Sequence, residues 1–221
     1  MKKKIYLILT LVLVLICAAV VLVACGSKNN NAVKDNISRR TDSYFAGEND
    51  SFAVSVEKGR REKTFIADGK ATDVIDFCRI TVIPLKSNDY KSVNFVIAGD
   101  GETLSGEIQS SDFGEYSAEI ELAFIPKSVT VTAGSDTGEV ALTDMLEGKL
   151  TASDAVNVAK EEFKDKIAKE AEEGKPEREI YVKLITGDRT NYYYYVSFIG
   201  EGVDYWAMLI DPANGNVISK R

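Results

Sequence analysis

The feature that most constrains the fold is an alternation of apolar and polar side chains with a period of two over residues 50–133. Side chains on a β-strand point alternately to its two faces, so this period indicates strands with one buried face. Clear examples are 52–56, 93–97 and 120–124, and turn sequences such as Asp68-Gly69 separate them. About seven short strands of this kind predict an antiparallel β-sandwich of the immunoglobulin-like type.

The pattern changes after residue 133. The glycine-containing stretch 134–149 is expected to be a linker, and a helical period follows it. Thr151 and Asp154 have the spacing of a helix capping box. Apolar residues then recur every three or four positions as one stripe: Ala152, Ala155, Val156, Ala159, Phe163 and Ile167. Strands are predicted at 179–186, 192–199, 203–210 and 216–219, so this part reads as a helix packed on an antiparallel sheet, a small α+β unit.

Residues 150–221 resemble a PepSY-type domain. The resemblance rests on the helix opening Leu150–Ala155, the strand Tyr192–Phe198 and the closing stretch Tyr205–Ile218. It implies a non-catalytic extracytoplasmic domain of the kind found in propeptides of secreted metallopeptidases and in bacterial envelope proteins. Inhibition or local control of a peptidase is a role proposed for that family, which has no catalytic residues to transfer.

The N-terminus reads as an export signal. Three lysines precede an uncharged apolar run from Ile5 to Ala24. The sequence Leu22-Val23-Ala24-Cys25-Gly26 resembles the lipobox of bacterial lipoproteins. That resemblance implies a signal peptide over 1–24, cleavage before Cys25, and acyl chains such as palmitate on Cys25 that hold the protein at the extracytoplasmic side of the bacterial cell membrane. The alternative is an uncleaved single-span anchor, since the apolar run is long enough to cross a bilayer.

The polar stretch 25–49 is expected to be a lipidated flexible tether, because it contains few large apolar side chains. Arg39 and Arg40 within it are candidates for contact with anionic headgroups. The chain has three cysteines, of which Cys17 lies in the leader and Cys25 is the lipidation site. The remaining one, Cys78, is expected to be a buried, inert thiol.

Composition excludes several function classes. The formal net charge is −7, which argues against nucleic-acid binding, and the chain has no histidine, which removes Ser-His-Asp and Cys-His catalytic arrangements. The acidic turns at 99–102 and 211–216 lack the oxygen spacing of a calcium loop and are read as hairpin turns. We therefore expect no metal and no cofactor.

The run Tyr192-Tyr193-Tyr194-Tyr195 is the most unusual local motif. On a strand, Tyr192 and Tyr194 would pack on the helix, while Tyr193 and Tyr195 would lie on the opposite face. Exposed aromatic clusters often mark interfaces, so Tyr193 and Tyr195 are candidate partner-binding residues. The alternatives are that this face packs on the β-sandwich, or that cross-strand aromatic pairs stabilise the sheet.

Taken together, the sequence predicts a non-enzymatic, membrane-anchored lipoprotein that binds a protein or peptide partner, with modulation of a peptidase as one role. The first alternative is a structural or assembly module of the cell envelope that contacts wall or surface components. The second is an enzyme that uses carboxylates alone.

Overall fold

The computed structural model describes residues 36–86, 90–110, 116–202 and 204–221. The predicted leader and lipidation site, 1–24 and Cys25, lie outside these residues. The described elements, in chain order, are β1 Ile37–Glu48, β2 Phe52–Glu62, β3 Val74–Pro84, β4 Ser92–Gly99, β5 Glu102–Gln109, β6 Tyr116–Glu119, β7 Ser128–Ala133, β8 Asp136–Ala141, β9 Thr143–Asp144, α3 Ala152–Glu162, α4 Lys164–Glu172, β10 Glu179–Thr186, β11 Tyr192–Ile199, β12 Tyr205–Ile210 and β13 Val217–Lys220.

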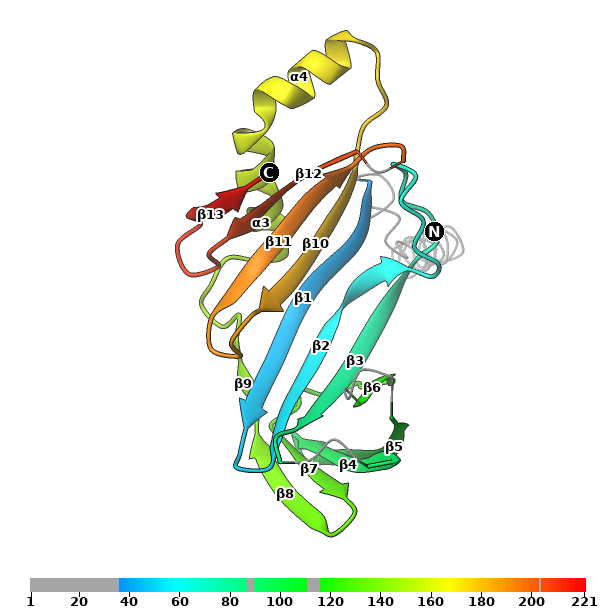
Figure 1. Ribbon diagram of the computed structural model, residues 1–221, viewed down its shortest axis with the longest axis vertical. Helices are drawn as coiled ribbons and strands as arrows, with labels where there is room; N and C mark the ends of the chain where they lie inside the picture. Colours follow the sequence, from blue (N-terminus) through cyan, green and yellow to red (C-terminus); the bar gives the residue numbers. More distant parts are fainter. Residues whose placement is uncertain (1–35, 87–89, 111–115, 203) are drawn as a thin grey trace, which may run out of the picture.

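The strands form two sheets (Figure 1). The large sheet has the order β13-β12-β11-β10-β1-β2-β3-β6, with the short β9 paired to β1, and the small sheet has the order β5-β4-β7-β8. The pairing of β1 with β10 is parallel, whereas the neighbouring strands on either side pair antiparallel. Strand β1 therefore joins the N-terminal and C-terminal halves into one continuous sheet.

This position of β1 corrects the predicted tether over 25–49. Residues 37–48 form a strand that is hydrogen-bonded on both edges, and its buried polar side chains, those of Ser38, Arg39 and Thr41, have partners inside the protein. Arg39 forms two 2.9 Å hydrogen bonds with the Glu57 carboxylate, and the Thr41 hydroxyl donates to the same group at 2.6 Å. A buried polar group is tolerated when it has such partners. The predicted linker 134–149 is likewise wrong in part, because it contains β8 and β9.

The small sheet packs on the β1–β2–β3–β6 part of the large sheet and forms a β-sandwich, as predicted. Side chains that alternate along β2, β3, β4 and β7 fill its core, including Val56, Ile80, Ile97 and Val129, all fully buried. The strand predicted at 120–124 is absent, since β6 ends at Glu119. Ile120, Leu122 and Phe124 still contact this core from an irregular segment, so their alternation reports burial rather than pairing.

A second core lies between α3 and strands β10–β12. The predicted capping box is present: the Thr151 hydroxyl accepts from the Asp154 amide, and the Asp154 carboxylate accepts from the Thr151 amide. The apolar stripe of α3 is buried through Phe163, where the helix breaks at φ −104° and ψ 10°. Helix α4 then projects beyond the end of the large sheet (Figure 1). The apolar stripe predicted as one helix from Ala152 to Ile167 is therefore divided between two helices. The predicted combination of a β-sandwich with an α+β unit is confirmed.

Both layers cover the same face of the large sheet. Residues that lie directly opposite each other on neighbouring strands point to the same face of a sheet. Arg40 of β1 is the partner of Val182 on β10 and of Arg60 on β2, so these three side chains share one face. Val182 packs in the core beneath α3, whereas Val56, on the same face of β2 as Arg60, packs in the sandwich. Among the described residues, no further sheet or helix covers the opposite face, which we call the open face. Within the same residues, no helix is long and apolar enough to cross a bilayer.

Candidate functional site

The tyrosine run lies on β11 and divides between the two faces as predicted. Tyr194 is fully buried in the core beneath α3, and its hydroxyl donates to the Leu150 carbonyl at 3.1 Å. Burial raises the pKa of Tyr192 to about 12, and the ring centroid of Tyr192 lies 5.5 Å from that of Tyr44. Tyr193 and Tyr195 are half-buried on the open face.

The two candidate residues, Tyr193 and Tyr195, have different surroundings. Tyr195 lies between Lys183 of β10 and Leu209 of β12, and it lines a groove of about 470 Å³ and a second one of about 330 Å³. Tyr193 lies opposite Ile185 near the start of β11 and lines neither groove. Tyr195 is therefore the better placed of the two to contact a partner.

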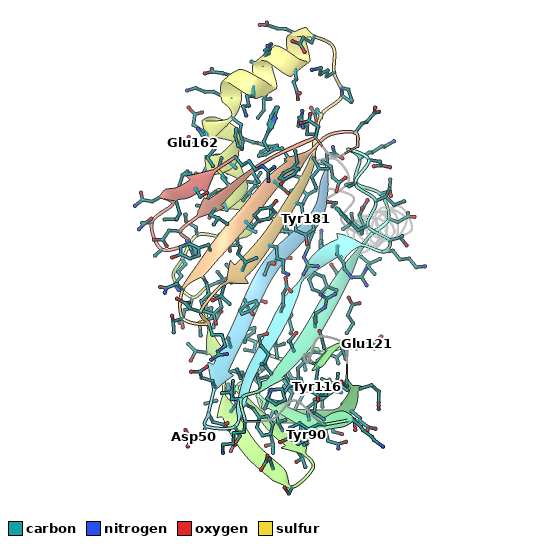
Figure 2. The ribbon with its side chains drawn as sticks, viewed as in Figure 1. Asp50, Tyr90, Tyr116, Glu121, Glu162 and Tyr181 are labelled. Atoms are coloured by element: carbon teal, nitrogen blue, oxygen red, sulfur yellow. The ribbon has the colours of Figure 1, made fainter. Side chains whose placement is uncertain are left out.

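The groove of about 470 Å³ crosses the seam between β1 and β10 on the open face, and we call it the seam groove. Tyr181, labelled near the middle of the large sheet in Figure 2, lines it beside Tyr195. Phe65, half-exposed on the segment between β2 and β3, contributes a ring whose centroid lies 5.5 Å from that of Tyr181. Three aromatic rings from three different parts of the chain thus meet in one groove.

Arginines supply the charge of the seam groove. Arg39 is buried, its guanidinium lies 4.8 Å from the Phe77 ring centroid and 5.8 Å from that of Tyr181, and its Nε atom has no hydrogen-bond partner. Such stacking over aromatic rings favours a cation. Glu57 balances the charge of Arg39, so this pair holds the floor of the groove in place.

Arg61 and Arg79 share one carboxylate, that of Glu119. Arg61 reaches it at 2.9 Å and 2.7 Å, and Arg79 at 3.1 Å. The hydrogen bond from Arg61 holds the pKa of Glu119 below its ordinary value, so the carboxylate is ionised at neutral pH. All three side chains are between about a fifth and two fifths exposed, and exposed ion pairs exchange at little cost. A partner's carboxylate can therefore replace Glu119 on the two guanidinium groups.

Sequence reasoning did not single out this cluster. Arg60 and Arg61 lie near the end of β2 and point to opposite faces of the large sheet. Arg39 was placed in a tether as a contact for headgroups, and it is instead buried in the sheet. The alternation of side chains along the end of β2 was the signal in the sequence that could have placed Arg61 on this face. Its neighbours Phe77, Arg79 and Glu119 come from β3 and β6, so no local pattern reveals the cluster.

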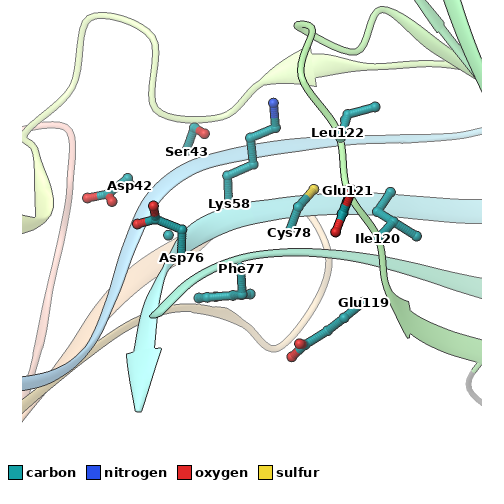
Figure 3. A pocket seen from close by; sticks show the side chains of 11 residues that line it. Asp42, Ser43, Lys58, Asp76, Phe77, Cys78, Glu119, Ile120, Glu121 and Leu122 are labelled. Atoms are coloured by element: carbon teal, nitrogen blue, oxygen red, sulfur yellow. The ribbon is translucent and has the colours of Figure 1, made fainter. Parts of the chain in front are cut away.

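A separate cavity of about 740 Å³ lies beside Cys78 (Figure 3). Burial raises the pKa of the Cys78 thiol to about 11, so the thiol is protonated at neutral pH. The neighbouring Lys58 amine donates to the Phe124 carbonyl at 2.9 Å. The expectation of a buried free thiol is confirmed.

The turn at 211–216 is a hairpin turn, as predicted. The Asp211 carboxylate accepts from the Ala213 amide at 2.8 Å and from the Asn214 side chain at 3.0 Å. These bonds, with the amide of Gly215 donating to the Asp211 carbonyl at 2.8 Å, close the loop on itself. The carboxylate that could suggest a metal ligand is thus used to shape the turn.

The C-terminal part of the chain consists of a capped helix packed on antiparallel strands, and it ends in the hairpin of β12 and β13. The family model described as "Peptidase propeptide and YPEB domain" (PepSY) matches residues 149–221. This match supports a PepSY domain at residues 149–221. The match covers about a third of the chain, and the sandwich and β1 lie outside it. Searches of curated proteins and of solved structures found no match.

In these terms, Tyr193 and Tyr195 belong to the PepSY domain, and so does Tyr181. The other half of the seam groove, with Arg39 and Arg61, comes from strands that precede the domain. The groove is therefore a composite surface that the PepSY domain does not form alone.

Proposed function

We propose that the protein is a non-catalytic lipoprotein, anchored through Cys25 to the extracytoplasmic side of a bacterial membrane, that binds a protein or peptide partner through the seam groove. The observation that carries the proposal is the meeting of Phe65, Tyr181 and Tyr195 with two partly exposed arginines. Aromatic side chains and arginine are the residue types that dominate binding energy at protein interfaces. The PepSY domain makes a peptidase the first partner to test.

The test for the groove is direct binding to a purified secreted metallopeptidase, together with its rate of proteolysis. Tyr195→Ala is expected to weaken binding about tenfold or more, because it removes an aromatic anchor. Tyr195→Phe keeps the ring and is expected to bind as the unmodified protein does. Tyr193→Ala is expected to have the smaller effect, because Tyr193 lies outside the groove.

Circular dichroism confirms that each variant is folded. The proposal fails if folded Tyr195→Ala retains full binding. Retention of the protein by isolated cell-wall material, with no binding to peptidases, supports the alternative of an envelope assembly module.

The anchor has its own test. Cys25→Ser removes the thiol that would carry the acyl chains, so the protein should leave the membrane fraction and lose labelling by radioactive palmitate. Cys78→Ser is the matched control, since its thiol is buried, and it should leave labelling unchanged. Labelling that persists in Cys25→Ser would refute the lipid anchor.

A further inference from the structure

Helix α4 presents an apolar side that nothing in the described protein covers. None of its residues is buried, and Ile167 is 37% exposed. Ala168 and Ala171 lie beside Ile167 on the same side of the helix and are also exposed. A helix of nine residues is marginal in water, and helices are normally stabilised by burying such a side.

Across from this side lies the end of the large sheet, and the two enclose a groove of about 440 Å³ that we call the α4 groove. Ile180, Phe198 and Trp206 line its sheet side. The volume falls within the range of ligand-binding clefts, which are apolar with a few polar groups at the edge. Trp206 and Phe198 point to the face of the sheet that α3 covers, so the α4 groove is on the opposite face from Tyr195.

The groove is held open by Arg178. Its guanidinium stacks on the Trp206 ring at 4.0 Å and forms hydrogen bonds of 2.7 Å and 2.6 Å with the Glu170 carboxylate. Arg178 is largely buried, and these contacts fix α4 at a distance from the sheet. A site that is formed before binding loses less conformational entropy when a partner arrives.

Four basic and two acidic side chains line the α4 groove, in a protein whose net charge is −7. The basic side chains are Lys160, Lys164, Lys175 and Arg178, and Arg178 is already paired with Glu170 and with Asp204 outside the lining. Glu177 is the other carboxylate in the lining. Lys164 and Lys175 also form ion pairs with the exposed Glu161 and Glu173. Exposed pairs of this kind contribute little, so the lysines can exchange them for the charges of a partner.

We infer that the α4 groove binds an apolar peptide segment flanked by acidic residues. The apolar side chains of the segment would cover Ile167 and Trp206, and its carboxylates would meet Lys160 and Lys164. The site is distinct from the seam groove, and the inference does not depend on the function proposed above.

The single tryptophan of the chain, Trp206, makes the inference measurable by fluorescence. The probe is a synthetic peptide with a leucine-rich centre flanked by glutamates, titrated into the purified full-length protein. We expect a saturable shift of Trp206 emission and competition by added salt. The same peptide with lysine flanks is expected to bind about tenfold more weakly or not at all.

Variants locate the binding. Ile167→Asp places a negative charge on the uncovered side of α4 and should weaken binding about tenfold or more. Ile125→Asp, at another exposed isoleucine on the segment before β7, is the matched control and should change nothing. Lys160→Glu combined with Lys164→Glu reverses the rim charge without touching the apolar lining, and should also weaken binding about tenfold.

Three results would overturn the inference. The first is equal affinity for the glutamate-flanked and lysine-flanked peptides. The second is full binding by folded Ile167→Asp and by the double lysine variant. The third is saturation of the Trp206 signal by decanoate with no response to either peptide, which would make the occupant a lipid. Tyr195→Ala should leave the peptide titration unchanged, because Tyr195 does not line the α4 groove. The test of the α4 groove can therefore fail without affecting the proposal for the seam groove.

Discussion

Helices α3 and α4 are consecutive and of similar length, yet only one is part of a core. Helix α3 buries Ala152, Ala155, Val156 and Ala159 and begins with a capping box, whereas α4 buries nothing and has no side-chain cap. Both contain mainly good helix formers. The difference shows that burial, rather than intrinsic propensity, fixes α3 on the sheet, while α4 is held by the contact between Glu170 and Arg178.

The largest expected effect tests the point where the two helices meet. Phe163→Ala removes a side chain that is 2% exposed and whose ring lies 5.6 Å from Phe198 and 5.5 Å from Trp206. The cavity should lower the free energy of unfolding by about 3–5 kcal/mol. Chemical denaturation measures it. If the free energy of unfolding falls by less than about 1 kcal/mol, Phe163 does not stabilise the core and behaves like the exposed residues of α4.

A smaller effect concerns the attachment of α4. Glu170→Gln weakens the contact with Arg178 and should lower the local opening free energy of α4 by roughly 1.5 kcal/mol. Amide hydrogen exchange should then be faster over 164–172 and unchanged over 152–162. Glu161→Gln, on an exposed ion pair, is the control.

The same contact predicts a dependence on pH. Hydrogen bonding from Arg178 lowers the pKa of Glu170 from its ordinary value of 4.5. A lowered carboxyl pKa stabilises the folded state above pH 4.5, and this stabilisation is lost as the pH falls through the lowered value. The unmodified protein should therefore approach the exchange behaviour of Glu170→Gln in acid. A difference that persists unchanged at low pH would contradict this origin of the stability.

The smallest expected effect is at the start of α3. Thr151→Ala removes the hydroxyl that accepts from the Asp154 amide and should cost about 1 kcal/mol of stability. Thr151→Ser keeps the hydroxyl and should be close to neutral. Thermal unfolding distinguishes the two, and equal melting temperatures for Ala and Ser would show that packing alone positions α3.

The sequence predicted well what is local. The capping box and the bounds of β10 and β11 depend on residues close in the chain, and the structure has them where they were expected. The alternation along β11 also placed Tyr193 and Tyr195 on the face opposite the helix. Periodicity could not reveal the break at Phe163, because the apolar stripe continues to Ile167 across it.

What the sequence could not provide depends on distant partners. Residues 37–48 read as a polar tether, because Glu57, which neutralises Arg39, lies 18 positions away, and β10, which pairs with the same strand, is more distant still. The seam groove combines Phe65, Arg79 and Tyr195 from three separate segments. No window of the sequence contains these residues together, so only the topology could bring them to one surface.

The central place of β1 also has a consequence for how the molecule folds. The Thr41 hydroxyl accepts from the Leu184 amide, a contact between residues 143 positions apart, and the whole seam closes a loop of that size. Contacts of such long range carry a large entropic barrier and form slowly, so we expect docking of β10 on β1 to be a late step. Until then β10 is an unpaired strand edge, the kind of surface at which a second chain adds itself. A PepSY domain cut out at residue 149 would keep that edge permanently.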